Sequence, residues 1–244
     1  MSNVYLVTGA TSDVGLALLR RIFRPGDTLI AQGGKNLSLL ADLCRENPGR
    51  VHTYSVDLSD DTATRLFITD VLAGCPLPTH IIHLPALRVV NTRFRSFDEA
   101  RFEEDFSVQV RSAILICRAF LPKMAKAGRG RVLFMQSSYA LGAPPKNVSA
   151  YVVAKSALGG LAKSLAVEYA ASGITVNMVA PCMMETRFLA DTPDLIVQAA
   201  AAANPMGRNA RVEDVVPAME FLLSEEAGFI TGVTLPITGG SVIL

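Results

Sequence analysis

Short apolar runs alternate with longer amphipathic stretches along the whole chain. The apolar runs predict strands at Val4–Val7, Thr28–Ala31, Val51–Val56, His80–Leu84, Arg131–Met135, Thr175–Ala180 and Thr234–Ile237. Helical patterning covers Val14–Phe23, Leu37–Glu46, Asp61–Leu72, Phe97–Ala127, Ala150–Ala171 and Val212–Leu223. Strands that alternate with helices indicate a parallel sheet, and runs that are apolar throughout suit strands covered on both faces. The pattern predicts one doubly wound, Rossmann-type α/β domain over residues 1–244, with a parallel sheet and helices on both faces.

Two features of the pattern go beyond a simple alternation of strands and helices. An insertion between Met183 and Arg208 contains the run Ala199–Ala203, which predicts short helices forming a substrate flap. The long helices predicted at 97–127 and 150–171 carry apolar residues on more than one face. Such helices need a partner beyond their own sheet, which predicts a homotetramer or homodimer.

Composition narrows the class of protein. The chain has 244 residues, 50% of them hydrophobic, and a formal net charge of +1, which gives no reason to expect nucleic acid or an anionic membrane as a partner. Its four cysteines show no C-x-x-C spacing and no histidine clustering, so we expect reduced thiols and no metal site. No run of eighteen apolar residues occurs, and Met1 leads directly into a strand. We therefore expect a soluble cytoplasmic protein.

Tyr151 and Lys155 are the most informative pair of polar residues. They lie four residues apart on a predicted helix, so they share one face. There the ammonium can lower the phenol pKa from its ordinary value of about 10. Such a phenol can give a proton to a carbonyl oxygen while hydride reaches the carbon. Ser138, thirteen residues upstream, would share that oxygen through a second hydrogen bond.

A glycine turn follows the first predicted strand, with the sequence Thr8-Gly9-Ala10-Thr11-Ser12-Asp13-Val14-Gly15. A turn of this kind brings backbone N–H groups and a helix N-terminus to a pyrophosphate. Taken alone it predicts an anion cradle, with an ordinary strand-to-helix turn as the alternative.

Together these motifs resemble the short-chain dehydrogenase/reductase family over essentially the whole chain, and most of all its 3-oxoacyl-carrier-protein reductases. The resemblance implies that Ser138, Tyr151 and Lys155 are catalytic, with Gln109 in place of the asparagine that completes a tetrad. It implies cofactor binding by Gly9, Thr11, Ser12, Asp13, Val14, Gly15, Gly34, Lys35, Asp57, Leu58, Leu84, Pro85, Tyr151, Lys155, Pro181, Met184 and Thr186.

The chain departs from the family pattern in the cofactor groove. Asp13 replaces the middle glycine, where its carboxylate could repel the pyrophosphate, turn outward or cap the helix; we expect the cap. His83-Leu84-Pro85-Ala86 replaces Asn-Asn-Ala-Gly, and we expect His83 to be a hydrogen-bonded structural residue. Cys182 replaces a glycine, and we expect it to pack as a small apolar side chain. These departures leave a non-catalytic nucleotide-binding pseudo-enzyme as an alternative.

Cofactor choice and substrate follow from the remaining loops. The end of the second strand has no acid to bind a ribose 2′-hydroxyl, and Lys35 offers a charge for a 2′-phosphate, which favours NADPH over NADH. The predicted substrate loops carry cations and apolar residues, namely Arg88, Arg93, Arg95, Lys146, Arg187, Leu141, Met183, Met184, Phe188 and Leu189. A second basic edge comprises Lys123, Lys126, Arg129 and Arg131. We expect a β-ketoacyl thioester, carried by an acyl carrier protein, with a free small ketone, sugar or polyketide as the alternative.

Overall fold

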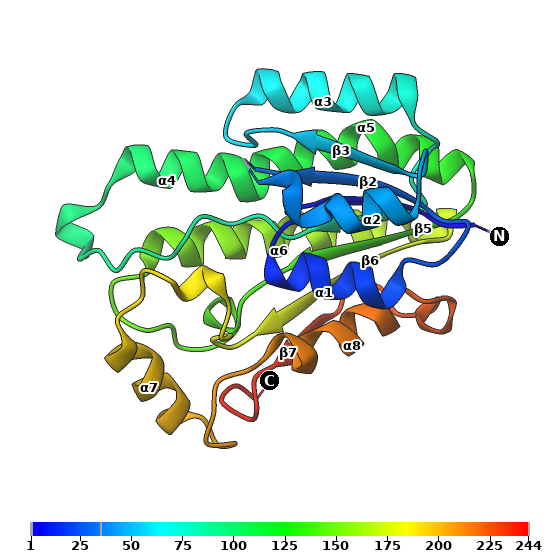
Figure 1. Cartoon of the computed structure of the whole chain (residues 1–244). Helices are drawn as coiled ribbons and strands as arrows, with labels where there is room; N and C mark the ends of the chain where they lie inside the picture. The colour runs from blue at the N-terminus through cyan, green and yellow to red at the C-terminus, as the bar shows by residue number, and fades with distance from the viewer. Residues whose placement is uncertain (1, 35, 244) are drawn as a thin grey trace.

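Seven parallel strands form the centre of the molecule in the computed structural model, which describes residues 2–34 and 36–243 (Figure 1). They are β1 (Val4–Thr8), β2 (Thr28–Gly33), β3 (Val51–Ser55), β4 (His80–His83), β5 (Gly130–Met135), β6 (Ile174–Pro181) and β7 (Thr234–Ile237). Their order across the sheet is β3-β2-β1-β4-β5-β6-β7, and every neighbouring pair is parallel. The predicted doubly wound α/β fold is confirmed.

The strand order reverses between β1 and β4, which are neighbours in the sheet. In doubly wound sheets the crevice beyond the carboxyl ends of the strands at such a reversal is where ligands bind. Every residue of β1 and of β4 is buried, because helices cover both faces of the sheet. The strand order therefore places the expected site beyond the carboxyl ends of β1 and β4.

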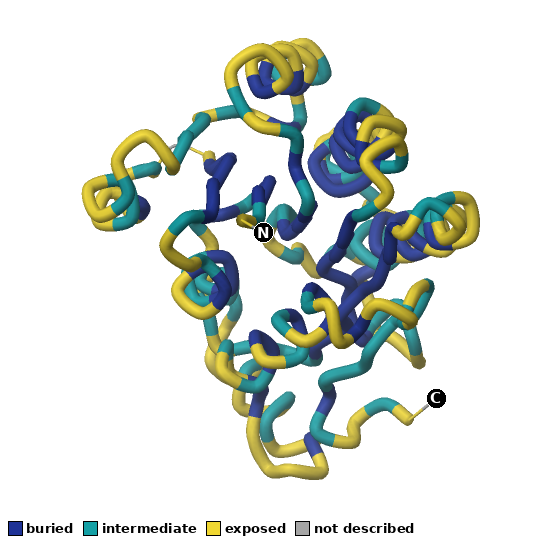
Figure 2. Tube along the Cα trace, turned by 90° about the vertical axis from the view of Figure 1, so that its right-hand side faces the viewer, coloured by how far each residue is buried: buried dark blue, intermediate teal, exposed yellow. Residues whose placement is uncertain are grey.

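Helices cover the sheet in two layers, each built on its own apolar cluster. One layer comprises α1 (Asp13–Ile22), α2 (Ala41–Glu46) and α8 (Val212–Leu223). The other comprises α3 (Asp61–Gly74), α5 (Ser112–Lys126) and α6 (Ser149–Tyr169). Figure 2 shows these helices with buried sides toward the strands and exposed sides outward, as amphipathic patterning requires.

The single helix predicted over 97–127 is wrong in detail. The chain forms a short 3-10 turn at Phe94–Ser96, then α4 (Glu99–Phe106), a π turn (Ser107–Arg111) and α5. Asp98 caps α4 by accepting a hydrogen bond from the Arg101 N–H. The π turn is a departure that a periodic apolar pattern does not reveal, and such turns are frequent at functional sites.

The insertion after β6 forms a 3-10 turn at Arg187–Leu189 and one further helix, α7 (Asp194–Ala203). Helix α7 stands beyond the carboxyl ends of the strands, at the end of the sheet toward which α4 also extends (Figure 1). Segment 183–208, called the flap below, thus lies at the end of the sheet where the crevice is expected. In the described part of the chain, the helices are all too short or too polar to cross a membrane.

Candidate active site

A cleft of about 1310 Å³ opens at the carboxyl ends of the central strands and beneath the flap. The predicted cofactor and catalytic residues that line it are Gly9, Thr11, Ser12, Asp13, Val14, Gly34, Asp57, Leu58, Leu84, Pro85, Tyr151, Lys155, Pro181, Met184 and Thr186. Three other predicted residues, Gly15, Gln109 and Ser138, are outside this lining, and Lys35 lies outside the described residues. Residues far apart in the sequence are therefore brought to one cleft.

The glycine turn leaves its backbone open to the cleft. Gly9 has a φ of +70°, and a Cβ there would lie 3.2 Å from the Pro85 nitrogen. Gly15 lies beneath the turn and outside the cleft lining. A Cβ on Gly15 would lie 2.7 Å from the Ala10 carbonyl oxygen. Glycine at position 9 therefore lets the turn approach the segment after β4, and glycine at position 15 lets the start of α1 pack against the turn. This cradle fits the pyrophosphate of a dinucleotide, since backbone and a helix N-terminus face the cleft.

The predicted capping role of Asp13 is wrong. Ser12 is the N-cap of α1: its hydroxyl accepts from the Gly15 N–H at 3.0 Å and donates to the Gly9 carbonyl at 2.8 Å. The Asp13 carboxylate instead accepts two hydrogen bonds from Arg187 in the flap, from the backbone N–H at 2.7 Å and from Nε at 2.6 Å. Asp13 is thus one half of an ion pair across the rim of the cleft.

Ser137 takes the place beside Tyr151 that we predicted for Ser138. The Ser137 and Tyr151 hydroxyls are hydrogen-bonded, and Ser137 lines the cleft. Ser137 is extended, with φ −141° and ψ 144°, whereas Ser138 begins a 3-10 turn and is buried outside the cleft lining. The backbone changes from extended at Ser137 to a 3-10 turn at Ser138, so the two side chains leave it in different directions and only Ser137 lines the cleft. The Ser137-Ser138 dipeptide in the sequence allows either serine to be the partner of Tyr151.

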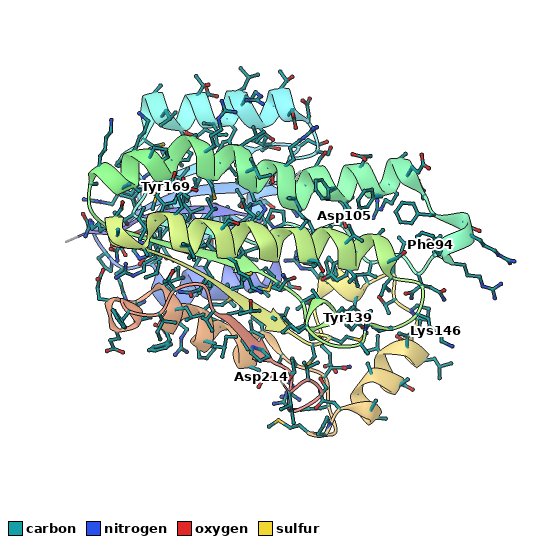
Figure 3. The ribbon with its side chains drawn as sticks, turned by 180° about the vertical axis from the view of Figure 1, so that it is seen from behind. Phe94, Asp105, Tyr139, Lys146, Tyr169 and Asp214 are labelled. Atoms are coloured by element: carbon teal, nitrogen blue, oxygen red, sulfur yellow. The ribbon has the colours of Figure 1, made fainter. Side chains whose placement is uncertain are left out.

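Lys155 is buried and Tyr151 is partly buried on the cleft wall, and the loss of hydration shifts the pKa of both. Lys155 Nζ donates to the Met135 carbonyl at 2.7 Å and lies 5.7 Å from the centre of the Tyr151 ring. Burial lowers the pKa of Lys155 to about 8, opposed by the negative charge of Asp105 at the end of α4 (Figure 3). Burial also raises the pKa of Tyr151 far above its ordinary value, although the Ser137 hydrogen bond lowers it. In the free protein this direction is opposite to the one predicted from the Lys155 charge.

Gln109 lies in the π turn behind the cleft. Its side chain is fully buried, and neither amide atom has a hydrogen-bond partner among the described residues. Its backbone carbonyl bonds to His83 Nε2 at 2.9 Å, and His83 Nδ1 bonds to the Thr8 hydroxyl at 2.7 Å. Burial lowers the pKa of His83 to about 3, so the ring is neutral, and Nε2 carries its hydrogen because a carbonyl only accepts. The predicted structural role of His83 is confirmed, while a tetrad role for Gln109 stays a prediction.

The outer part of the cleft is largely apolar. Of the residues expected there, Arg88, Lys146, Arg187, Met183, Met184, Phe188 and Leu189 line the cleft, whereas Arg93, Arg95 and Leu141 do not. Arg88 is paired with Asp191, and Arg187 with Asp13. Figure 3 places Lys146 beyond the amino end of α6 and Tyr139 below the first turns of this helix. Tyr139, which sequence reasoning missed, meets the Tyr151 ring edge-on at 6.4 Å between ring centres.

Cys182 lines the same cleft. It is partly buried, and burial raises the pKa of its thiol. The nearest polar contact of the thiol is with Asn204 Nδ2 at 3.7 Å. A neutral, partly buried thiol agrees with the small packing side chain expected at this position.

The second basic edge does not adjoin the cleft of the same chain. Lys123 and Lys126 lie in the last turn of α5, and Arg131 is the second residue of β5. They therefore lie at the amino ends of the strands, whereas the cleft lies at the carboxyl ends. The Arg131 side chain is also buried and paired with Glu225 at 2.8 Å. Within one chain the edge thus lies at the opposite end of the sheet from the cleft, and its role in steering a carrier protein stays a prediction.

Known proteins resemble this chain over nearly its full length. A family model described as Enoyl-(Acyl carrier protein) reductase matches residues 9–241. A cis-4-hydroxycyclohexanecarboxylate dehydrogenase of Sinomonas cyclohexanicum is 30% identical, over 98% of this chain and 96% of that protein. A 3-oxoacyl-(acyl-carrier-protein) reductase of Pseudomonas aeruginosa is 27% identical over the same shares.

Among solved structures, one from Beutenbergia cavernae superimposes with a TM-score of 0.89 at 27% identity, covering 98% of this chain and 96% of that one. It is described as a proposed NAD(P)-dependent gluconate 5-dehydrogenase with bound NADP at low occupancy. The family model, over residues 9–241, includes the glycine turn from Gly9 onward, the Tyr-Lys helix and the flap. The chain therefore belongs to the short-chain dehydrogenase/reductase family, and it is an oxidoreductase that works with a nicotinamide cofactor.

Proposed function

We propose that this protein uses NADPH to reduce a ketone to an alcohol, and that the ketone is the β-keto group of an acyl thioester. One observation supports carbonyl reduction as the reaction. The Tyr151 hydroxyl, the Ser137 hydroxyl bonded to it and the Lys155 ammonium line the same cleft as the glycine turn. Donors arranged around one point suit a carbonyl oxygen that gains negative charge during reduction.

A nicotinamide cofactor held along the glycine turn and the Tyr151–Lys155 face would supply the hydride for the carbonyl carbon. Tyr151 gives its proton to the carbonyl oxygen as a general acid, and its raised pKa keeps it protonated at neutral pH. Ser137 hydrogen-bonds to the same oxygen, the role predicted for Ser138. Lys155 holds positive charge beside the Tyr151 ring, which stabilises the phenolate left after proton transfer.

The choice of NADPH rests on the end of β2. No acid occurs from Gln32 to Asn36, and open space surrounds the Cα of Gly34, where a side chain would meet nothing within 4 Å. Such a wall has room for a 2′-phosphate and lacks the acid that would bind a 2′-hydroxyl. The Beutenbergia cavernae structure with bound NADP agrees with this choice.

The acyl thioester rests on the outer cleft, where flap side chains Met183, Phe188 and Leu189 form an apolar wall. An acyl chain would remove such surface from water, whereas a sugar would not. The resemblance to the Pseudomonas aeruginosa reductase points the same way. The competing substrate is a free cyclic or small ketone, which the name of the Sinomonas relative favours.

We also propose that the protein assembles as a homotetramer or homodimer. Helices α5 and α6 expose apolar side chains away from the sheet, among them Ile114 at 42%, Val153 at 50% and Val167 at 84% exposure. A second copy packed on this face would cover them. Light scattering at micromolar concentration should give a dimer or tetramer, and a monomer would remove this part of the proposal.

Steady-state kinetics with three substrate forms separates the candidates. We expect kcat/KM for acetoacetyl-carrier protein to exceed that for its N-acetylcysteamine thioester, and both to exceed that for free ketones. Lys146→Glu at the cleft should lower the rate with the carrier-bound form only, with Lys123→Glu at the far end of the sheet as the matched control. Free ketones that react faster than either thioester would replace this substrate with the alternative.

A further inference from the structure

Ion pairs fasten the flap to the body of the protein on two sides of the cleft. Arg88, in the loop after β4, pairs with Asp191 of the flap. Arg187 of the flap pairs with Asp13 of the glycine turn, and its Nη2 also donates to the Thr11 carbonyl at 2.9 Å. With the two bonds to the Asp13 carboxylate, three hydrogen bonds join Arg187 to one turn.

The position of this second pair is the informative part. Asp13 begins α1 and lines the cleft where backbone N–H groups and the helix N-terminus would meet the cofactor pyrophosphate. A helix N-terminus stabilises a carboxylate, but the same carboxylate repels a second anion bound there. An unpaired Asp13 would therefore weaken cofactor binding.

We propose that Asp13 and Arg187 form a charge-compensated latch, in which Arg187 neutralises the carboxylate and closes the flap over the pyrophosphate. Arg187 is thus a positioning residue, and the inference rests on the proposed nicotinamide cofactor. Because the latch fixes the backbone of Arg187, it also fixes Thr186, the adjacent residue on the cleft wall.

The latch is built to open. The Asp13 side chain is 27% exposed and that of Arg187 is 54% exposed, so water and salt screen the pair. Cofactor exchange requires the flap to move away from the turn, and an exposed ion pair allows this at small cost. The second pair, between Arg88 and Asp191, is exposed as well.

Cofactor affinity in a single and a double variant tests the compensation. The chain has no tryptophan, so NADPH binding can be followed through the fluorescence of the cofactor itself. Arg187→Gln should weaken NADPH binding by about tenfold, because it leaves the Asp13 carboxylate unpaired beside the pyrophosphate. Asp13→Ala/Arg187→Gln should return the dissociation constant to within about threefold of the parent protein, since the repelling charge is gone. Arg208→Gln breaks the flap ion pair with Asp214 outside the cleft and should leave affinity unchanged.

Rescue separates compensation from simple flap attachment. If Arg187 only tethered the flap, the double variant would bind as weakly as Arg187→Gln, and the proposal would be overturned. An Arg187→Gln variant with the affinity of the parent protein would overturn it as well.

Hydrogen exchange in the cofactor-free protein tests the latch without any ligand. The Arg187 N–H donates to Asp13, so Asp13→Ala should speed exchange in the peptide that contains residues 186–189, and Arg208→Gln should not. Unchanged exchange in Asp13→Ala would refute the latch. A protein that shows this exchange difference but binds neither NADPH nor NADH would keep the latch and refute the proposed function instead.

Discussion

Two pairs of polar residues in the cleft, one on its inner wall and one on its outer rim, differ in how far they are shielded from water. On the inner wall, Tyr151 and Lys155 lie four residues apart on α6, where Lys155 is buried and Tyr151 partly buried. On the outer rim, Asp13 and Arg187 are 174 residues apart in the sequence and partly exposed. Burial shifts the pKa of both inner groups, whereas the rim pair depends on a contact that water screens. The inner wall is suited to proton transfer and the rim to closing and opening.

Removing the Tyr151 hydroxyl should have the largest effect. Tyr151→Phe keeps the ring but loses the proton donor, so kcat should fall by about 10²-fold or more. NADPH affinity should stay close to that of the parent protein, because the loss belongs to the inner wall alone. Rapid kinetics together with a binding titration measures both quantities. A variant that retains full turnover would remove Tyr151 as the general acid.

The two adjacent serines give the next largest effect and control for each other. Ser137→Ala should lower kcat by about tenfold to a hundredfold, because it removes a hydrogen bond to the developing oxyanion. Ser138→Ala should change kcat by less than about threefold, since Ser138 is outside the cleft lining. Equal losses, or the reverse order, would show that the cofactor-bound protein presents Ser138 instead.

Lys155 should show a conflict between stability and activity. Its pKa of about 8 lies below the value of an exposed lysine, so folding disfavours its charged form. Lys155→Met should abolish turnover yet raise the free energy of unfolding at pH 7 by on the order of 2 kcal/mol. The penalty is fully present below pH 8 and is lost as pH rises from about 8 toward 10.5, so the two stability curves should converge over that range. Urea titrations at several pH values test this, and a variant that is less stable at every pH would contradict it.

The two histidines of β4 should govern acid stability. Burial lowers the pKa of His80 to about 4 and that of His83 to about 3, so both are neutral in the fold. The unfolded chain binds these protons from about pH 6.5 downward, so stability should be lost as pH falls through that range. His80→Gln should reduce this dependence by up to about 1 kcal/mol per pH unit between pH 6 and 4.5. A thermal unfolding series across that range is the measurement, and an unchanged slope would refute the assignment.

Cofactor preference should be the smallest effect. NADPH should bind about fivefold more tightly than NADH, since an exposed lysine–phosphate pair contributes only about 1 kcal/mol. Raising the salt concentration should narrow this difference and leave the Tyr151→Phe effect unchanged. Calorimetry with both reduced cofactors measures this ratio of affinities. Tighter binding of NADH would contradict the preference for NADPH inferred from the end of β2.

Local spacing explains which features could be predicted. The strands and the position of Tyr151 relative to Lys155 depend on periods of two and of 3.6 residues, so they could be read from the chain. The serine could not be assigned, because Ser137 and Ser138 differ only in where β5 gives way to a 3-10 turn. The Asp13–Arg187 contact joins distant segments and has no local signature. The direction of the Tyr151 pKa also needed the fold, since it depends on burial rather than on the nearby charge.

The π turn at Ser107–Arg111 has a geometric consequence for the long rod formed by α4 and α5. One residue beyond a regular helical turn rotates all later side chains by about 100° around the axis. The turn therefore works as a phase shift, which lets Asp105 point toward the Leu87 N–H while Phe120 and Met124 meet the sheet. Deleting one residue within 107–111 would restore one continuous helical phase. The helix could then keep either the Asp105 contact with the Leu87 N–H or the packing of Phe120 and Met124 on the sheet, but not both.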